Sequence, residues 1–204
     1  MNRLTFLLTP VTPFTVQRSD TGLHVTASSV KGLLRTASTL GMDELLGPGH
    51  SCESLSTSCS LERRPSTLKS WPCLICRTYG FEGRKGSVLR VRYLEGRSST
   101  LPGEDYEFKY RFLYRKNTYR VPVSRSSIEV TVTSEDVCAP VVVATGLLYI
   151  DQGVVRMGKF RSRGLGILNV KYREVPQEVR GDRSLKDESN LRELLTLKCL
   201  GGRG

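Results

Sequence analysis

The stretch IEVTVTSEDVCAPVVVATGLLYIDQGVVRMGKFRSRGLGILNVKY, residues 128–172, decides the fold. Residues 128–133 alternate apolar and polar side chains, which predicts a half-buried strand. Residues 137–150 are almost entirely apolar and predict a buried helix or a mixed apolar element. Residues 166–172 predict a last strand, and a basic, glycine-containing loop at residues 158–166 precedes it. The stretch thus predicts a strand, a buried element and a strand in succession.

The preceding part of the chain supplies the remaining elements of the fold. Residues 3–8 have strand propensity, and residues 87–94 alternate apolar side chains with arginine, as a half-buried strand with a basic outer face does. Between them, a helix is expected to begin at Ser28 as N-cap and to end near Gly41. Its apolar positions have helical spacing: Val30, Leu33, Leu34 and Ala37. The order strand, helix, strand, strand, helix, strand predicts an α+β fold of the ferredoxin-like or RRM-like class.

Residues 105–120 predict an extended hairpin outside this core. Tyrosine and phenylalanine recur there at mostly even spacing, with lysine and arginine between or beside them. Because alternate residues of a strand point to the same side, the pattern predicts one aromatic face.

A chain of 204 residues is long enough for one well-packed domain with additions and short for two domains of ordinary size. We expect one domain, two additions and a tail: residues 1–175 for the domain, 47–80 for a cysteine-rich insertion, 97–125 for the hairpin region and 176–204 for the tail. The tail should contain a short helix with Ser184 and Asp187 as its capping pair and a stop at Gly201.

The formal charge of +11 indicates a polyanionic partner. Arginine supplies much of it, and its planar guanidinium pairs with phosphate and stacks on bases. The alternative is a solvated basic surface that only serves solubility. No basic amphipathic helix points to anionic lipid, no apolar run is long enough to span a bilayer, and no signal-peptide pattern is present. We therefore expect no membrane association and a cytoplasmic location.

The loop at residues 158–166 combines glycines with cations. Glycines adopt positive φ and can turn successive N–H groups toward an anion, and the basic side chains add charge. The alternative is an ordinary basic turn. We expect RNA backbone to contact this loop through Gly158, Lys159, Arg161, Ser162, Arg163, Gly164 and Gly166.

A second candidate anion site is the helix start at residues 28–35, SSVKGLLR. Lys31 lies in the first turn, where the positive end of the helix dipole disfavours a cation. Its presence there is explained if a phosphate accepts hydrogen bonds from Ser28, Ser29 and Lys31 together. The alternative is a serine cap with an exposed lysine, which costs a few tenths of a kcal/mol.

Four cysteines lie within the polar insertion: Cys52, Cys59, Cys73 and Cys76. The last two have C-x-x-C spacing, and four thiolates in one short segment suit a structural Zn²⁺ site. Disulfides or free thiols are the alternative, and His50 is a possible replacement for Cys52 or Cys59. Cys138 and Cys199 are expected to fill the core.

Catalytic signatures are weak. His24 and His50 are the only two histidines, and no cluster of acidic residues suits a two-metal nuclease. His24 is expected to be a surface histidine rather than a general base.

Four ordered motifs resemble the RAMP superfamily of CRISPR-associated proteins, and within it the backbone subunit of type III (Csm/Cmr-like) effector complexes. They are residues 28–35, similar to S-S-x-K-G-x-x-R; residues 73–80, CLICRTYG, similar to C-x-x-C-R-x-F-G; residues 120–122, RVP; and residues 158–166, similar to G-x-x-x-S-R-G-x-G.

The resemblance implies an RRM-like palm, a β-hairpin thumb and a zinc-binding insertion. It implies a guide-RNA-binding backbone subunit that scaffolds recognition of target RNA in antiviral defence, with other RAMP subunits and a large effector subunit as partners. Lys31, Arg35, Lys159, Arg161 and Arg163 would contact the guide backbone. Arg115, Lys116 and Arg120 would contact RNA from the hairpin region.

The first loop departs from the family pattern. Active backbone subunits carry a catalytic aspartate there, but in this chain the loop is shorter and Asp20 matches the turn before the helix instead. We therefore expect binding rather than catalysis, with Asp20 as the catalytic candidate if the chain cleaves target RNA. Two alternatives stay open: a repeat-processing endoribonuclease of the same superfamily that uses His24 as general base, and a zinc-containing RNA-binding protein outside CRISPR.

Overall fold

The computed structural model describes most of the chain. The described residues are 1–19, 22–52, 59, 68–69, 71–81, 84–93, 106–111, 118–159, 161–177, 179 and 185–201.

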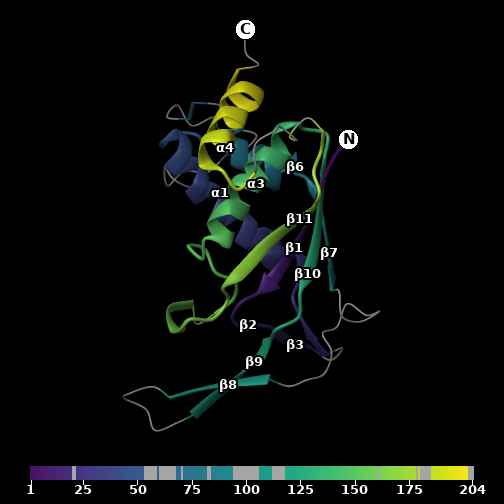
Figure 1. Cartoon of the computed structure of the whole chain (residues 1–204), viewed down its shortest axis with the longest axis vertical. Helices are drawn as coiled ribbons and strands as arrows, with labels where there is room; N and C mark the ends of the chain where they lie inside the picture. The colour runs from purple at the N-terminus through teal and green to yellow at the C-terminus, as the bar shows by residue number, and fades with distance from the viewer. Residues whose placement is uncertain are drawn as a thin grey trace.

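A four-stranded antiparallel sheet forms the centre of the molecule. Its strands are β1 (Asn2–Pro10), β7 (Val88–Tyr93), β10 (Ile128–Ser134) and β11 (Leu168–Glu174), in the spatial order β11-β1-β10-β7. Phe6 of β1 lies opposite Val130 on one side and Tyr172 on the other. The predicted α+β class is confirmed, because helices α1 and α3 follow β1 and β10 in the chain (Figure 1).

Helix α1 (Ala27–Leu46) is longer than predicted. Its N-cap is Thr26, whose Oγ1 accepts from the Ser29 amide at 3.1 Å, so the predicted cap at Ser28 is wrong. The predicted end near Gly41 is also wrong, since Gly47 is the C-cap. Gly41 lies inside the helix, where a Cβ atom would come within 3.0 Å of the Tyr149 ring, so glycine is needed for close packing rather than for termination.

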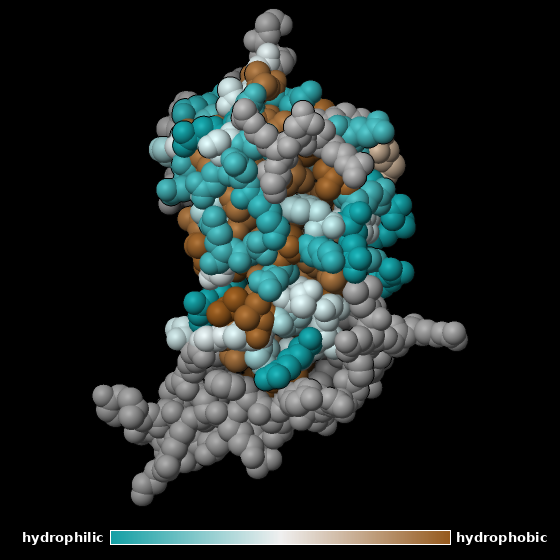
Figure 2. Space-filling model, in the orientation of Figure 1, coloured by the Kyte–Doolittle hydropathy of each residue, from teal (hydrophilic) through white to brown (hydrophobic). Residues whose placement is uncertain are grey.

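Helix α3 (Cys138–Asp151) is the partner of α1, and all of its residues from the first to Ile150 are buried. The two helices approach closely at Gly146, where a Cβ atom would lie 2.7 Å from the Ser38 backbone nitrogen. The predicted buried element at residues 137–150 is therefore a helix. Figure 2 shows the visible face of the described residues as mostly hydrophilic, with apolar atoms in separate patches.

The predicted hairpin is present in its backbone as β8 (Tyr106–Arg111) and β9 (Thr118–Ser124), and β2 (Phe14–Thr15) pairs with β9 as a third strand. The hairpin lies at the end of the molecule opposite α4 (Figure 1). The predicted aromatic face falls on side chains outside the described part. Two short ladders complete the strands: β3 (Gln17–Ser19) with β4 (Gly22–His24), and β5 (Gly80–Phe81) with β6 (Arg84–Lys85).

The chain ends in α4 (Glu188–Leu194) and a π-helical continuation (Leu195–Leu200). Asp187 is the N-cap, and its carboxylate accepts from the Asn190 amide at 3.0 Å. Its predicted capping partner, Ser184, lies outside the described residues. Leu191 and Leu195 are buried in the core, so this helix packs against the domain. None of the helices in the described ranges has the length and apolar character needed to cross a membrane.

Candidate functional site

The start of α1 and the glycine loop line one cleft of about 710 Å³. Ser29 and Gly32 form part of its rim from α1, and Gly158, Lys159 and Arg161 form part of its rim from the loop. All five residues are exposed. Two sequence motifs about 130 residues apart therefore meet at one concave surface.

The floor of the cleft is apolar. Val16 and Val25 precede α1, Leu33 comes from its buried face, and Val155 and Met157 lead into the glycine loop. Each of these side chains is at least nine-tenths buried, and all five are among the residues that line the cleft. The site thus combines an apolar bottom with a polar and cationic rim.

Gly158 and Gly166 fix the path of the loop. Both have positive φ, 83° and 81°. A Cβ atom at Gly158 would collide with Thr15 Oγ1, and one at Gly166 would collide with the Met157 carbonyl. The Lys159 amide donates to Thr15 Oγ1 at 2.7 Å, and the Gly166 amide donates to the Pro13 carbonyl at 2.9 Å. The loop is therefore held against β2 and the segment before it.

These hydrogen bonds correct the prediction of an anion nest. The amides of Lys159 and Gly166 donate to protein oxygens, and the Gly164 amide donates to the Arg161 carbonyl at 3.1 Å within a 3₁₀ turn at residues 161–163. In this conformation these three amides are not available to an anion. The loop presents the exposed cations Lys159 and Arg161 to the cleft instead of these three amides.

Arg156 lies beside the exposed cations and is partly committed to the loop. Its Nη1 donates to the Arg161 carbonyl at 2.8 Å and its Nε to the Gly153 carbonyl at 3.3 Å. The guanidinium therefore braces the turn that carries Arg161, and Arg156 also lines the cleft. Arg156 was not predicted as a site residue, because only its hydrogen bonds distinguish it from other surface arginines.

At the start of α1, the hydroxyl groups bond to one another. Thr26 Oγ1 lies 2.8 Å from both Ser28 Oγ and Ser29 Oγ. Ser29 faces the cleft, whereas Ser28 and the half-buried Lys31 are not among the residues that line it. The first turn contains no acidic residue that would oppose an anion.

Arg35 is placed differently from its prediction as a guide-RNA contact. Its Nη1 donates to the Gly80 carbonyl at 2.9 Å, and its Nη2 donates to Cys76 Sγ at 3.6 Å. It does not line the cleft. In this structure the guanidinium is directed at the cysteine-rich segment.

For most of the remaining predicted site residues, the structure describes no side chain. Asp20, Arg115, Lys116 and Ser184 lie outside the described residues. Arg120 lies on β9, Arg163 in the 3₁₀ turn and His24 on β4, but their side chains are outside the described part. Ser162 and Gly164 lie in the loop, and Ser162 is exposed. The roles predicted for these residues stay predictions.

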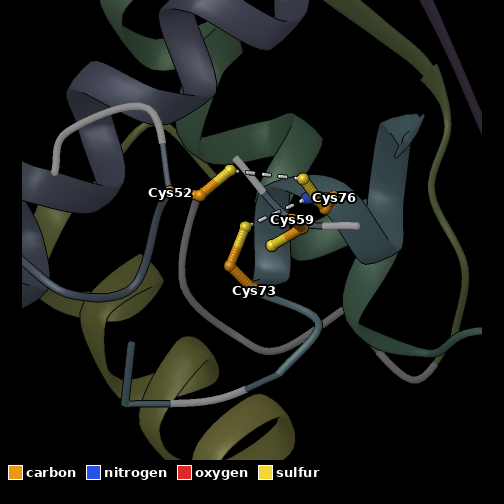
Figure 3. Close-up of side chains that lie close together, drawn as sticks. All are labelled: Cys52, Cys59, Cys73 and Cys76. Atoms are coloured by element: carbon orange, nitrogen blue, oxygen red, sulfur yellow. Dashed lines mark hydrogen bonds between the residues drawn. The ribbon is translucent and has the colours of Figure 1, made fainter. Parts of the chain in front are cut away.

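The four cysteines of the insertion come together as a candidate metal centre (Figure 3). The Sγ atoms of Cys52, Cys59, Cys73 and Cys76 all lie within 4.8 Å of one another, and all four residues are buried. Four sulfurs at about 2.3 Å from a tetrahedral zinc ion are about 3.8 Å apart, so the cluster fits that geometry with small adjustments. The donor set therefore fits a structural Zn²⁺ site.

Cys73 begins helix α2 (Leu74–Tyr79) and is its N-cap. The Cys76 amide donates to Cys73 Sγ at 3.4 Å, and Cys52 Sγ lies 3.4 Å from Cys76 Sγ. The hydrogen bond from the Cys76 thiol, followed by amide donors, lowers the pKa of Cys73 to about 5, although burial opposes it. Burial raises the pKa of Cys59 to about 11. One sulfur is thus poised as a thiolate, the form that binds metal.

His50 is not part of the cluster, although it is buried nearby in the sequence. Burial, with a smaller effect of Lys69, lowers its pKa. Cys138 and Cys199 are buried in the core as predicted, and Cys138 Sγ donates to the Lys198 carbonyl at 3.3 Å. The four-cysteine set is therefore the one that the geometry favours over the set with His50.

Polar contacts join α2 to the two large helices. Ser38 Oγ of α1 lies 2.8 Å from Tyr79 Oη and donates to the Val142 carbonyl of α3 at 2.9 Å. Arg77 pairs with Asp136, with Nε at 3.1 Å and Nη2 at 2.9 Å from Oδ2. Asp136 Oδ1 also accepts from the Cys138 amide at the start of α3, at 2.9 Å. These contacts fix the segment that carries the candidate metal centre to α1 and α3, and α1 also lines the cleft.

Comparison with known proteins shows which solved structure shares this fold. No family model matches the chain, and no curated protein matches it in sequence. Among solved structures, a chain of a type IV-B CRISPR complex aligns with a TM-score of 0.57 and 13% identity, over 90% of this chain and 96% of that chain. This chain has the fold of that CRISPR-complex subunit. A chain of the type III-B Cmr-beta complex bound to cognate target RNA aligns with a TM-score of 0.48 and 11% identity, over 86% of this chain and 61% of that one. At the level of fold, the first likeness confirms the resemblance to CRISPR-associated proteins that the motifs indicated.

Proposed function

We propose that this chain is a guide-RNA-binding backbone subunit of a CRISPR effector complex and contributes to RNA-guided recognition of target RNA. In this proposal residues 1–175 form a ferredoxin-like palm, the hairpin region at residues 97–125 is the thumb, and residues 176–204 form the tail. The strand order β11-β1-β10-β7 supports the palm, because the first strand lies between the last strand and the third strand of the core. The shared fold with a type IV-B complex chain supports the assembly.

The observation that carries the proposal is the meeting of the α1 entrance and the glycine loop at one cleft. Hydroxyl groups and cations at its rim are the groups that proteins present to a sugar–phosphate strand. The chain has a formal charge of +11, so the long-range field also favours a polyanion. Contacts of this kind bind RNA without selecting its sequence, as a subunit that accepts many guides requires.

Zinc would serve a structural role in this protein. Four thiolates complete a tetrahedral coordination sphere and leave no position for a substrate or a water nucleophile. Cys52, Cys59, Cys73 and Cys76 would hold the ion and fix the segment before α2 to that helix, which itself packs into the core through Leu74 and Ile75.

The proposal is tested on the complex purified from its source. The wild-type chain should co-purify with a large assembly and a short RNA of uniform length. Lys159→Ala with Arg161→Ala should lower the amount of bound RNA at least tenfold, because each lost phosphate contact weakens binding of the whole strand. The matched control is Lys171→Ala with Arg173→Ala, which removes the same charge from exposed positions on β11 outside the cleft.

Monomeric, RNA-free wild-type protein would contradict the proposal, as would equal losses in the two double variants. Cleavage of a repeat RNA by the purified chain, abolished by His24→Ala, would favour the repeat-processing nuclease instead. Loss of target cleavage at one site in an Asp20→Ala complex would show that the chain is catalytic.

A further inference from the structure

No described neighbour of Gly32 explains why this position of α1 is a glycine. It lies in the second turn of α1, and a Cβ atom there would meet no described atom within 4 Å. Gly41 and Gly146 differ, since neighbouring helices fill the space beside them. Glycine inside a helix makes the helix less stable than alanine does. The open space beside Gly32, at this wall of the cleft, therefore comes with a loss of helix stability.

The shape of the cleft indicates what uses that space. A sugar–phosphate strand needs only the hydroxyls and cations of the rim, but the cleft is about 710 Å³ and continues down to an apolar floor. Leu33 and Met157 in the floor offer no hydrogen-bond donors or acceptors from their side chains, which suits the flat face of a nucleobase. Unpaired bases of single-stranded RNA are free to leave the stack and enter such a hollow.

We propose that the cleft takes up the base of one unpaired nucleotide over Gly32, while Lys159 and Arg161 hold the adjoining phosphate. The inference rests on the proposed function and adds to it. It makes the cleft selective for single strands, because a base held in a duplex cannot enter. It also predicts tolerance of base identity, since the floor makes contacts through apolar atoms.

The test compares a short single-stranded RNA with the same RNA in which the bases are replaced by abasic ribose. Wild-type protein should bind the abasic strand about tenfold more weakly, as expected for loss of one base contact. The Cβ atom of Gly32→Phe would meet no described atom within 4 Å, and its ring would occupy space in the cleft, so this variant should bind both strands equally and weakly. Leu40→Phe is the matched control, because it places a ring at an exposed position of α1 outside the cleft, and it should retain the preference for the strand with bases.

Different results would contradict base uptake by the cleft and RNA binding by the protein. If wild-type protein binds both strands tightly and equally, or if Gly32→Phe keeps the preference, no base enters the cleft although RNA binds. If the wild-type protein binds neither strand, the proposed function fails as well. Thermal unfolding of both variants identifies a misfolded protein.

A separate observation concerns Arg35, which bridges two of the motifs. The residue belongs to the motif at residues 28–35, and it donates to Cys76 Sγ and the Gly80 carbonyl, which belong to the motif at residues 73–80. A zinc ion with four thiolates carries a net charge of about −2 in a buried site. A guanidinium remains protonated and can donate to a coordinated sulfur, which stabilises this charge.

We infer that Arg35 is a positioning residue for the metal centre and couples metal binding to the orientation of α1. Its side chain contacts a ligand sulfur and its backbone lies in the helix whose first turns line the cleft. Loss of metal should therefore weaken RNA binding, although no cysteine lines the cleft.

Arg35→Met keeps the length of the apolar stem and removes the donors. It should lower zinc affinity about 10- to 100-fold in competition with a chromophoric chelator, and it should shift the visible bands of the Co²⁺-substituted protein. Arg35→Lys should recover part of the affinity. Arg77→Met is the matched control, because Arg77 follows a ligand directly but pairs with Asp136. Equal zinc affinity in wild type and Arg35→Met, or equal losses in Arg35→Met and Arg77→Met, would overturn the assignment.

Discussion

Replacing Ser38 with alanine removes a hydroxyl that joins three helices. Its single hydrogen is donated to the Val142 carbonyl of α3, so the Tyr79 hydroxyl of α2 must donate to Ser38 Oγ. Burial raises the pKa of Tyr79 above its usual range, so the phenol stays protonated and remains a donor throughout the neutral range. Both side chains are nearly inaccessible to water.

The magnitude follows from what each substitution leaves unpaired. Ser38→Ala loses one hydrogen bond and leaves the buried Tyr79 hydroxyl without its acceptor, which should cost about 2–4 kcal/mol in the free energy of unfolding. Tyr79→Phe removes the hydroxyl together with its need for a partner and should cost about 1 kcal/mol. With Tyr79→Phe already in place, Ser38→Ala should cost only about 1 kcal/mol, the bond to Val142. The double variant should therefore be more stable than the sum of the single effects by about 1–3 kcal/mol.

Urea unfolding of the metal-loaded proteins measures these three free energies. Equal slopes of free energy against urea would establish that the midpoints report stability rather than a change in the unfolded state. Additive effects of the two substitutions would refute the assignment of Tyr79 as the donor and Ser38 as the shared acceptor. A Tyr79→Phe variant as unstable as Ser38→Ala would refute it as well.

Three further outcomes test the cleft and the metal centre. Gly158→Ala should lower the free energy of unfolding by about 1–3 kcal/mol and weaken RNA binding, because the new Cβ atom combines a positive φ with a collision at β2. Gly164→Ala should lower it less, because no described atom lies within 4 Å of a Cβ atom at that position. Thermal unfolding measures the stability of both variants, and RNA titration measures their binding. Cys73→Ser should abolish stoichiometric zinc in the purified protein, and Cys138→Ser, outside the cluster, should leave it intact. Lys159→Ala should reduce the slope of log affinity against log salt concentration by about 1, and an unchanged slope would mean that this lysine contacts no phosphate.

Strands β10 and β11 were predictable because each has one buried face along most of its length. In β10, residues 128–133 alternate buried and half-exposed positions, so the sequence pattern and the structure report the same periodicity. Helix ends were less predictable. Three neighbouring hydroxyl residues compete for the cap of α1, and only the backbone angles of Thr26 decide between them. Gly41 resembled a helix stop, but packing against α3 overrides its low helix propensity.

The candidate site was predictable in its residue types and not in its hydrogen bonds. Cations beside glycines and four cysteines in a polar insertion are local signals, and the structure brings each group together. The acceptors that occupy the loop amides are not local: Thr15 lies 144 residues from Lys159. The hydrogen bonds of Arg35 were not predictable for the same reason, since these acceptors lie 41 and 45 residues away. Sequence spacing carries no information about such partners.

The contacts of α1 connect the candidate metal centre to the cleft proposed to bind RNA. Lining residues of the cleft occupy the first turns of the helix, and Arg35 and Ser38 contact the cysteine-rich segment within the next turns, so one rigid element serves both sites. Helix α2 also packs into the core through Leu74 and Ile75, so the metal would add to an anchor that apolar packing already supplies. Metal binding energy contributes to folding energy, so without metal the contacts of α1 to Tyr79 and Gly80 should weaken. Metal binding then stabilises the wall of the cleft from behind, where no RNA atom needs to reach.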